Sequence, residues 1–119
     1  MSTLMVMRSA PYGSTNAKDA LDVALTLAAF EQSPCLLYQG AGLQQLLLDT
    51  SHTTPFKHIG KMLKALPMYD IPHIYIDQAS MASQKIAPEQ LDNLPVKCHI
   101  VDSEQVAKLL HNHQHIMVF

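Results

Sequence analysis

The fold of this chain is decided by residues 3–30, which read TLMVMRSAPYGSTNAKDALDVALTLAAF. Residues 3–8 are an apolar run of strand length, residues 9–15 are rich in turn-forming residues, and the apolar positions of residues 16–30 recur at helical spacing. The stretch therefore predicts one strand–loop–helix unit. Its loop follows the carboxyl end of a strand, where open α/β sheets place their functional sites.

The rest of the chain repeats this alternation. Further strands are predicted at residues 34–38, 72–77, 96–101 and 114–119, and helical segments are predicted at residues 43–48, 56–65 and 103–111. Residues 78–91 are predicted to form a short helix and a loop, broken by Pro88. Strands that alternate with helices are typical of a three-layer α/β domain, here a five-stranded, mainly parallel sheet with helices on both faces. No repeat, linker or low-complexity tract divides the sequence, so residues 1–119 are expected to form a single domain.

The helix at residues 16–30 has an unusual distribution of charge. Its charged residues lie near its start, behind a candidate cap at Asn16, and none lies between Val23 and Phe30. A helix that is apolar nearly all round must be buried on more than one side. A sheet covers one side only, so we expect the second side to meet another subunit, with coverage by a neighbouring helix as the alternative.

The composition excludes several classes of protein. Charged residues make up 15% of the chain, against about 25% in an average soluble domain, which favours burial against partner proteins. The formal net charge is -2 and Arg8 is the only arginine, which argues against direct binding of nucleic acid. The sequence shows neither a membrane span nor a signal peptide, and two cysteines are typical of a reduced cytoplasmic protein.

Few residues offer chemistry of their own. Cys35 and Cys98 lie in predicted strands, where cysteines are usually inert packing residues. His111, His113 and His115 alternate and could supply three nitrogen ligands, but a solvated loop is the favoured interpretation because no further ligand signature follows.

The stretch Gly40-Ala41-Gly42 begins like a dinucleotide fingerprint but has Gln45 at the third glycine position. It predicts instead a tight turn with a close backbone contact. The sequence therefore predicts no metal, no cofactor and no catalytic residue.

Four short motifs together resemble one family. They are SAPYG at residues 9–13 with ALD at 20–22, LPMYDI at 66–71, ASM at 79–81, and an apolar final strand that ends in Phe119. In this order and spacing they resemble the DsrE/DsrF-like family, and within it the TusC/DsrF branch. The resemblance spans essentially the whole chain and implies the same five-stranded α/β fold.

The resemblance also implies a function. TusB, TusC and TusD subunits form a dimer of heterotrimers that passes persulfide sulfur, through a TusE-like acceptor, toward 2-thiolation of the tRNA wobble uridine. The reactive cysteine of the TusD/DsrE branch lies at the end of the third strand, which corresponds here to Ile76 and Asp77. Neither residue can carry a persulfide. The resemblance thus implies a non-catalytic subunit with TusB-like and TusD-like partners in a heterohexamer.

Two alternatives stay open at this point. One is a DsrF-like subunit of the DsrEFH complex of dissimilatory sulfur oxidation, and the other is a stand-alone small-ligand-binding α/β protein. If the chain is a TusC-like or a DsrF-like subunit, the loop at residues 9–13 and the end of the third strand are candidate docking surfaces. We therefore expect partner contacts at Tyr12, Gly13 and Asp77.

Overall fold

The computed structural model describes residues 2–10, 15–47, 62–92 and 94–119. In chain order the elements are β1 (Thr3–Met7), α1 (Asn16–Ala29), β2 (Cys35–Tyr38), the 3₁₀ helix η1 (Gly40–Leu47), η2 (Leu66–Tyr69), β3 (His73–Asp77), α3 (Gln78–Ser83), η3 (Pro88–Leu91), β4 (Lys97–Val101), α4 (Ser103–Asn112) and β5 (His115–Val118). Residues 62–65 are helical and lead into η2. Most of the helix predicted at residues 56–65 lies outside the described residues, and the helix predicted at 43–48 is a 3₁₀ helix that begins earlier.

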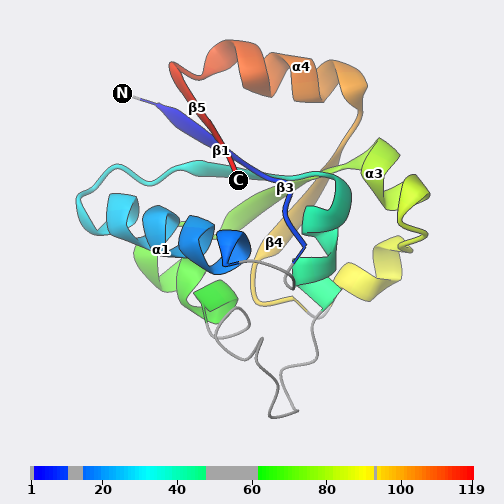
Figure 1. Ribbon diagram of the computed structural model, residues 1–119, viewed down its shortest axis with the longest axis horizontal. Helices are drawn as coiled ribbons and strands as arrows, with labels where there is room; N and C mark the ends of the chain where they lie inside the picture. Colours follow the sequence, from blue (N-terminus) through cyan, green and yellow to red (C-terminus); the bar gives the residue numbers. More distant parts are fainter. Residues whose placement is uncertain (1, 11–14, 48–61, 93) are drawn as a thin grey trace.

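The five strands form one parallel sheet in the order β4-β3-β2-β1-β5. The predicted fold class is therefore confirmed. Strands β1 to β4 step in one direction across the sheet, and the chain then returns so that β5 lies beside β1. Because such crossovers are right-handed, the reversed step places α4 on the face opposite α1. Figure 1 shows α4 above the sheet and α1 below it.

The two faces of the sheet are covered unequally. Alternate residues of a strand point to opposite faces, so Met5 and Met7 join the α1 side while Leu4 and Val6 join the α4 side. The α1 side holds a large core that also takes in η1, residues 63–66, α3 and η3. The α4 side holds a small core, to which α4 contributes one fully buried residue, Val106. Among the described residues, α4 is the one helix over that face, and Ile116 and Val118 at its β5 end stay exposed.

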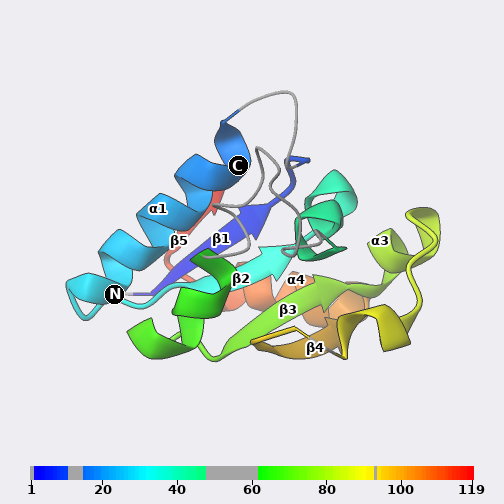
Figure 2. The ribbon, with the colours of Figure 1, turned by 90° about the horizontal axis from the view of Figure 1, so that it is seen from below.

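Helix α1 is buried on one side and half-buried on its second apolar side. Ala17, Ala20, Leu21 and Ala24 are buried against the sheet, and the second apolar side, with Val23 and Leu27, is half-buried against the same core. The segment at residues 62–69 lies alongside α1 (Figure 2) and provides some of this cover. A neighbouring helical segment, η2, therefore lies against part of this second side, in line with the neighbouring-helix alternative. Phe30, just after the helix, is 74% exposed and has no such cover.

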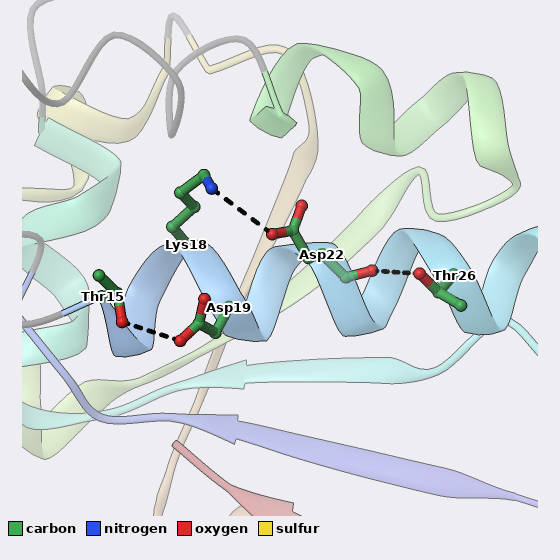
Figure 3. Close-up of polar contacts among 5 residues, drawn as sticks. All are labelled: Thr15, Lys18, Asp19, Asp22 and Thr26. Atoms are coloured by element: carbon green, nitrogen blue, oxygen red, sulfur yellow. Dashed lines mark hydrogen bonds and ion pairs between the residues drawn. The ribbon is translucent and has the colours of Figure 1, made fainter.

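The helix starts follow local hydrogen bonding. Asn16 is the first helical residue of α1, and Thr15 occupies the cap position, where its carbonyl oxygen accepts the Asp19 N–H at 2.9 Å. The Thr15 hydroxyl donates to Asp19 Oδ2 at 2.9 Å and caps no backbone N–H (Figure 3). The predicted cap, Asn16, was therefore wrong by one residue. Threonine and asparagine are both favourable at the cap position. The cap of α4 is Asp102, which forms a reciprocal capping box with Gln105.

Candidate functional site

The carboxyl edge of the sheet brings together the segments that follow β1, β2 and β3. Tyr12 and Gly13 of the loop after β1 lie outside the described residues. Asp77, the third predicted docking residue, ends β3 and directly precedes α3. Its side chain is half-buried. The described part of this edge therefore consists of residues 8–10, the start of η1 and the β3–α3 junction.

A chain of hydrogen bonds ties two of these segments together. The Ser80 hydroxyl donates to Asp77 Oδ2 at 2.6 Å and accepts a hydrogen bond from the Gly40 backbone N–H at 2.8 Å. Asp77 therefore holds the first turn of α3, and Ser80 fastens that turn to the exit of β2. Sequence reasoning singled out Ser80 only as part of the ASM motif and did not find this role, which depends on strands distant in sequence.

The turn after β2 packs against the end of β1, as the glycine pattern predicted. Gly40 has a left-handed φ of +53°, and a Cβ built on Gly42 would lie 1.9 Å from the Met7 carbonyl oxygen. Nearby, the buried Gln45 side-chain amide donates to the Ser9 carbonyl oxygen at 2.8 Å. Sequence reasoning noted Gln45 only as a missing glycine, whereas the structure uses it to hold the exit of β1.

Replacing Ser80 with alanine is expected to lower the free energy of unfolding by about 1–2 kcal/mol, the usual cost of leaving a buried polar group without its partner. The variant removes the acceptor of the Gly40 N–H and the donor to Asp77. Urea unfolding followed by circular dichroism measures the change.

Ser83→Ala is the matched control for this change. The Ser83 hydroxyl donates within α3 to the Ser80 carbonyl oxygen and lies on the exposed side of the helix. Its loss should cost no more than about 0.5 kcal/mol. Equal destabilisation by the two variants would show that the hydrogen bonds between α3 and the exit of β2 add nothing to the free energy of unfolding.

The two cysteines lie far from the carboxyl edge. Cys35 is the first residue of β2 and packs on the α4 side, whereas Cys98 is the second residue of β4 and packs against the α1-side core. Burial raises the pKa of the Cys35 thiol to about 11. Burial, with the Asp92 carboxylate as a smaller cause, also raises the pKa of Cys98. Both thiols are therefore protonated near neutral pH and are poor nucleophiles, in agreement with the packing role predicted for them.

The end of β3, where the related branch has its reactive thiol, is closed in this chain. Ile76 is completely buried in the core, and the Asp77 carboxylate is hydrogen-bonded to Ser80. Neither side chain offers a nucleophile for sulfur transfer.

A cavity of about 310 Å³ lies at the opposite, amino edge of the sheet. Cys35, His73, Tyr75 and His113 line it together with Asp70 and several hydroxyl-bearing residues. His73 is hydrogen-bonded to His99 on β4 at 3.0 Å. This cavity is far from the predicted docking residues, and its one thiol is the protonated Cys35.

The alternating histidines do not converge. His111 lies in α4, His113 follows that helix with its Nδ1 2.6 Å from the Leu109 carbonyl oxygen, and His115 begins β5. Within the described ranges, no three His, Cys, Asp or Glu residues are arranged to hold a metal ion. The helices of the described part of the chain include none with the length and apolar character needed to cross a bilayer.

Comparisons with known proteins add to this picture. A protein named TusC homolog from Vibrio vulnificus is 26% identical over 115 residues, which cover 96% of this chain and 95% of that protein. A TusC homolog from Pasteurella multocida is 33% identical over 92 residues, which cover 72% of this chain and 75% of that protein. The intracellular sulfur oxidation protein DsrF of Allochromatium vinosum is 27% identical over 127 aligned positions, covering 94% and 91% of the two chains.

The fold itself has a solved counterpart. The crystal structure of the ychN protein from E. coli superimposes with a TM-score of 0.81 at 18% identity and covers 100% of this chain and 99% of that one. The model of the DsrE/DsrF-like family matches residues 1–119. With the parallel sheet, the four motifs and this full-length match in agreement, the chain belongs to the DsrE/DsrF-like family.

Proposed function

We propose that this chain is the TusC-type, non-catalytic subunit of a cytoplasmic sulfur-relay complex that supports 2-thiolation of the tRNA wobble uridine. Its partners are a TusB-like and a TusD-like subunit in a heterohexamer, and a TusE-like protein accepts the sulfur. The chain itself contacts neither tRNA nor membrane. Similarity to proteins named TusC homolog, over nearly the full chain in the Vibrio vulnificus case, supports the subunit type.

The placement of the thiols carries the non-catalytic assignment. A sulfur carrier needs a thiolate that the next thiol can reach. Here the end of β3 carries Ile76 and Asp77, while both cysteines are partly buried, with raised thiol pKa values, and lie on opposite sides of the sheet. Sulfur transfer must then take place on a partner subunit, and this chain contributes binding surface.

Two surfaces are available for partner contacts in this proposal. The first is the carboxyl edge, where Asp77 ends β3; contacts at Tyr12 and Gly13 remain an expectation from the sequence. Asp77 presents a half-buried carboxylate that Ser80 holds in place. The second is an apolar patch formed by Phe30, Met68 and Tyr69, which are all exposed. The segments that carry it lie together, since the Ser33 hydroxyl donates to the Tyr69 carbonyl oxygen.

Replacing both cysteines, as Cys35→Ala with Cys98→Ala, is expected to leave thiolation within about twofold of the unaltered level, because neither thiol is reactive. The measurement is the 2-thiouridine content of bulk tRNA, by mass spectrometry, in cells whose only copy of this gene carries both changes.

The control for this experiment is the reactive cysteine of the TusD-like partner, whose replacement by serine should abolish thiolation in the same cells. Loss of thiolation in the double variant, with the complex still assembled, would make one of the two thiols a relay group and would overturn the proposal. Affinity purification of the complex separates that result from simple loss of folding.

A second candidate function is the DsrF-type role in sulfur oxidation, which the similarity to the DsrF protein of Allochromatium vinosum favours. The two are distinguished by complementation. A strain lacking its own TusC should regain 2-thiouridine when it receives this chain together with its TusB-like and TusD-like partners. Failure to regain it, with the complex assembled, would favour the sulfur-oxidation role.

A further inference from the structure

Strand β5 is an open edge of the sheet. It pairs with β1 on one side, and the strand order among the described residues ends there. All of its residues are exposed, with Ile116 at 45% and Val118 at 61%. An exposed, apolar edge strand is a template for another strand, because its outward backbone groups lack partners.

The backbone register shows which groups point outward. His115 N–H donates to the Ser2 carbonyl oxygen at 3.0 Å, and Phe119 N–H donates to the Val6 carbonyl oxygen at 2.9 Å. In a parallel pair the N–H and C=O of one residue point the same way, and the direction alternates along the strand. The outward residues of β5 are therefore Ile116 and Val118, placed symmetrically on either side of Met117.

The side chains of β5 do not protect this edge. Natural sheets guard exposed edges with lysine, proline or a bulge. The opposite edge strand, β4, begins with Lys97. Strand β5 reads HIMV and has no acidic residue, lysine, arginine or proline. Its register places Ile116 beside Leu4 and Val118 beside Val6, so the apolar surface of the α4-side core continues to the open edge.

We propose that β5 pairs antiparallel with β5 of a second copy of this chain, across a two-fold axis at Met117. Ile116 exchanges both backbone hydrogen bonds with Val118 of the partner subunit, and Val118 does the same with Ile116 of the partner subunit. The two sheets then become one continuous sheet. A second copy fits because the outward groups are symmetric about Met117, which is what an isologous interface needs. A strand without lysine, arginine, aspartate or glutamate also requires no partner of opposite charge.

The register can be tested by disulfide trapping. In this pairing the two Met117 positions face each other as a non-hydrogen-bonded pair, with Cα atoms about 4.5 Å apart, a separation that suits a disulfide. Met117→Cys is made in the full-length chain with Cys35→Ala and Cys98→Ala, and diamide serves as the oxidant. We expect most of the chain to become a covalent dimer. Ile100→Cys, in the same background on the other edge strand, should remain uncoupled.

The energetic contribution of the edge can be tested with a matched pair of substitutions. Ile116→Lys places a charge on the proposed interface, whereas Ile100→Lys places one on β4 at a similar exposure of 39%. Sedimentation equilibrium should show that Ile116→Lys raises the dimer dissociation constant at least about tenfold and that Ile100→Lys leaves it unchanged. Circular dichroism confirms that both variants are folded.

Several results would overturn this proposal. One is an unaltered chain that stays monomeric at about 100 μM, a concentration at which even weak specific pairing is visible. Others are a dimer that Met117→Cys does not trap, or one that the two lysine variants weaken equally. Pairing of β5 with a different subunit only, and never with a second copy, would overturn it as well. None of these outcomes depends on whether the chain supports tRNA thiolation.

Discussion

Replacing Gly42 with alanine is expected to destabilise this protein by about 3 kcal/mol or more, the upper range for overpacking. The added Cβ would lie 1.9 Å from the Met7 carbonyl oxygen and 2.7 Å from its carbonyl carbon. Both are backbone atoms at the end of β1, so they cannot move aside without separating η1 from the sheet. Thermal unfolding should show a melting temperature lower by roughly 10 °C or more, or the variant should be recovered as insoluble protein.

Gly40→Ala is the matched control, because it changes the same turn for a different reason. Gly40 has a φ of +53°, yet a Cβ built there meets nothing within 4 Å. Its expected cost is about 1 kcal/mol, which reflects the left-handed backbone alone. If Gly42→Ala unfolded no earlier than Gly40→Ala, the close approach of η1 to β1 would not be a constraint on this fold.

The double variant Phe30→Ser with Met68→Ser is expected to weaken binding to the partner subunits at least about thirtyfold, or roughly 2 kcal/mol, which is typical of central apolar anchors. This prediction rests on the proposed function. Phe30 is largely exposed and Met68 is 84% exposed, so they stabilise the isolated chain little. Calorimetric titration of the purified chain with the TusD-like and TusB-like subunits measures the affinity.

Ile100→Ser is the control for that experiment, because it removes an exposed apolar side chain from the edge strand β4, outside the proposed patch. It should leave the affinity within about twofold, as expected for a change away from the interface. Melting temperatures of both variants should stay close to the unaltered value. Unchanged affinity of the double variant would mean that the patch of Phe30, Met68 and Tyr69 is not the partner surface. The carboxyl edge of the sheet would then be the remaining proposed surface.

Much of the fold could be predicted from local sequence pattern. The apolar runs predicted every strand of the sheet. The paired glycines predicted the close backbone approach near Met7. These features depend on residues close together in the chain, where periodicity, capping and turn chemistry act directly.

Other features depend on which strands become neighbours. The sequence contained Ser80, Asp77 and Gly40, but their hydrogen bonds exist only because the exits of β2 and β3 lie side by side. The second apolar side of α1 predicted a subunit contact, and the structure covers part of it with residues 62–69. Apolar periodicity indicates that a surface is buried but does not identify what buries it.

The sequence by itself determined the parallel α/β class, the family motifs and the absence of a thiol at the end of β3. It could do so because residue identity and short-range spacing are sufficient for each. Only the tertiary structure decided that Cys35 and Cys98 lie on opposite faces, and that β5, apolar throughout, is an open edge. The register between strands sets the faces of the two cysteines, and the return of the chain after β4 leaves β5 at the edge.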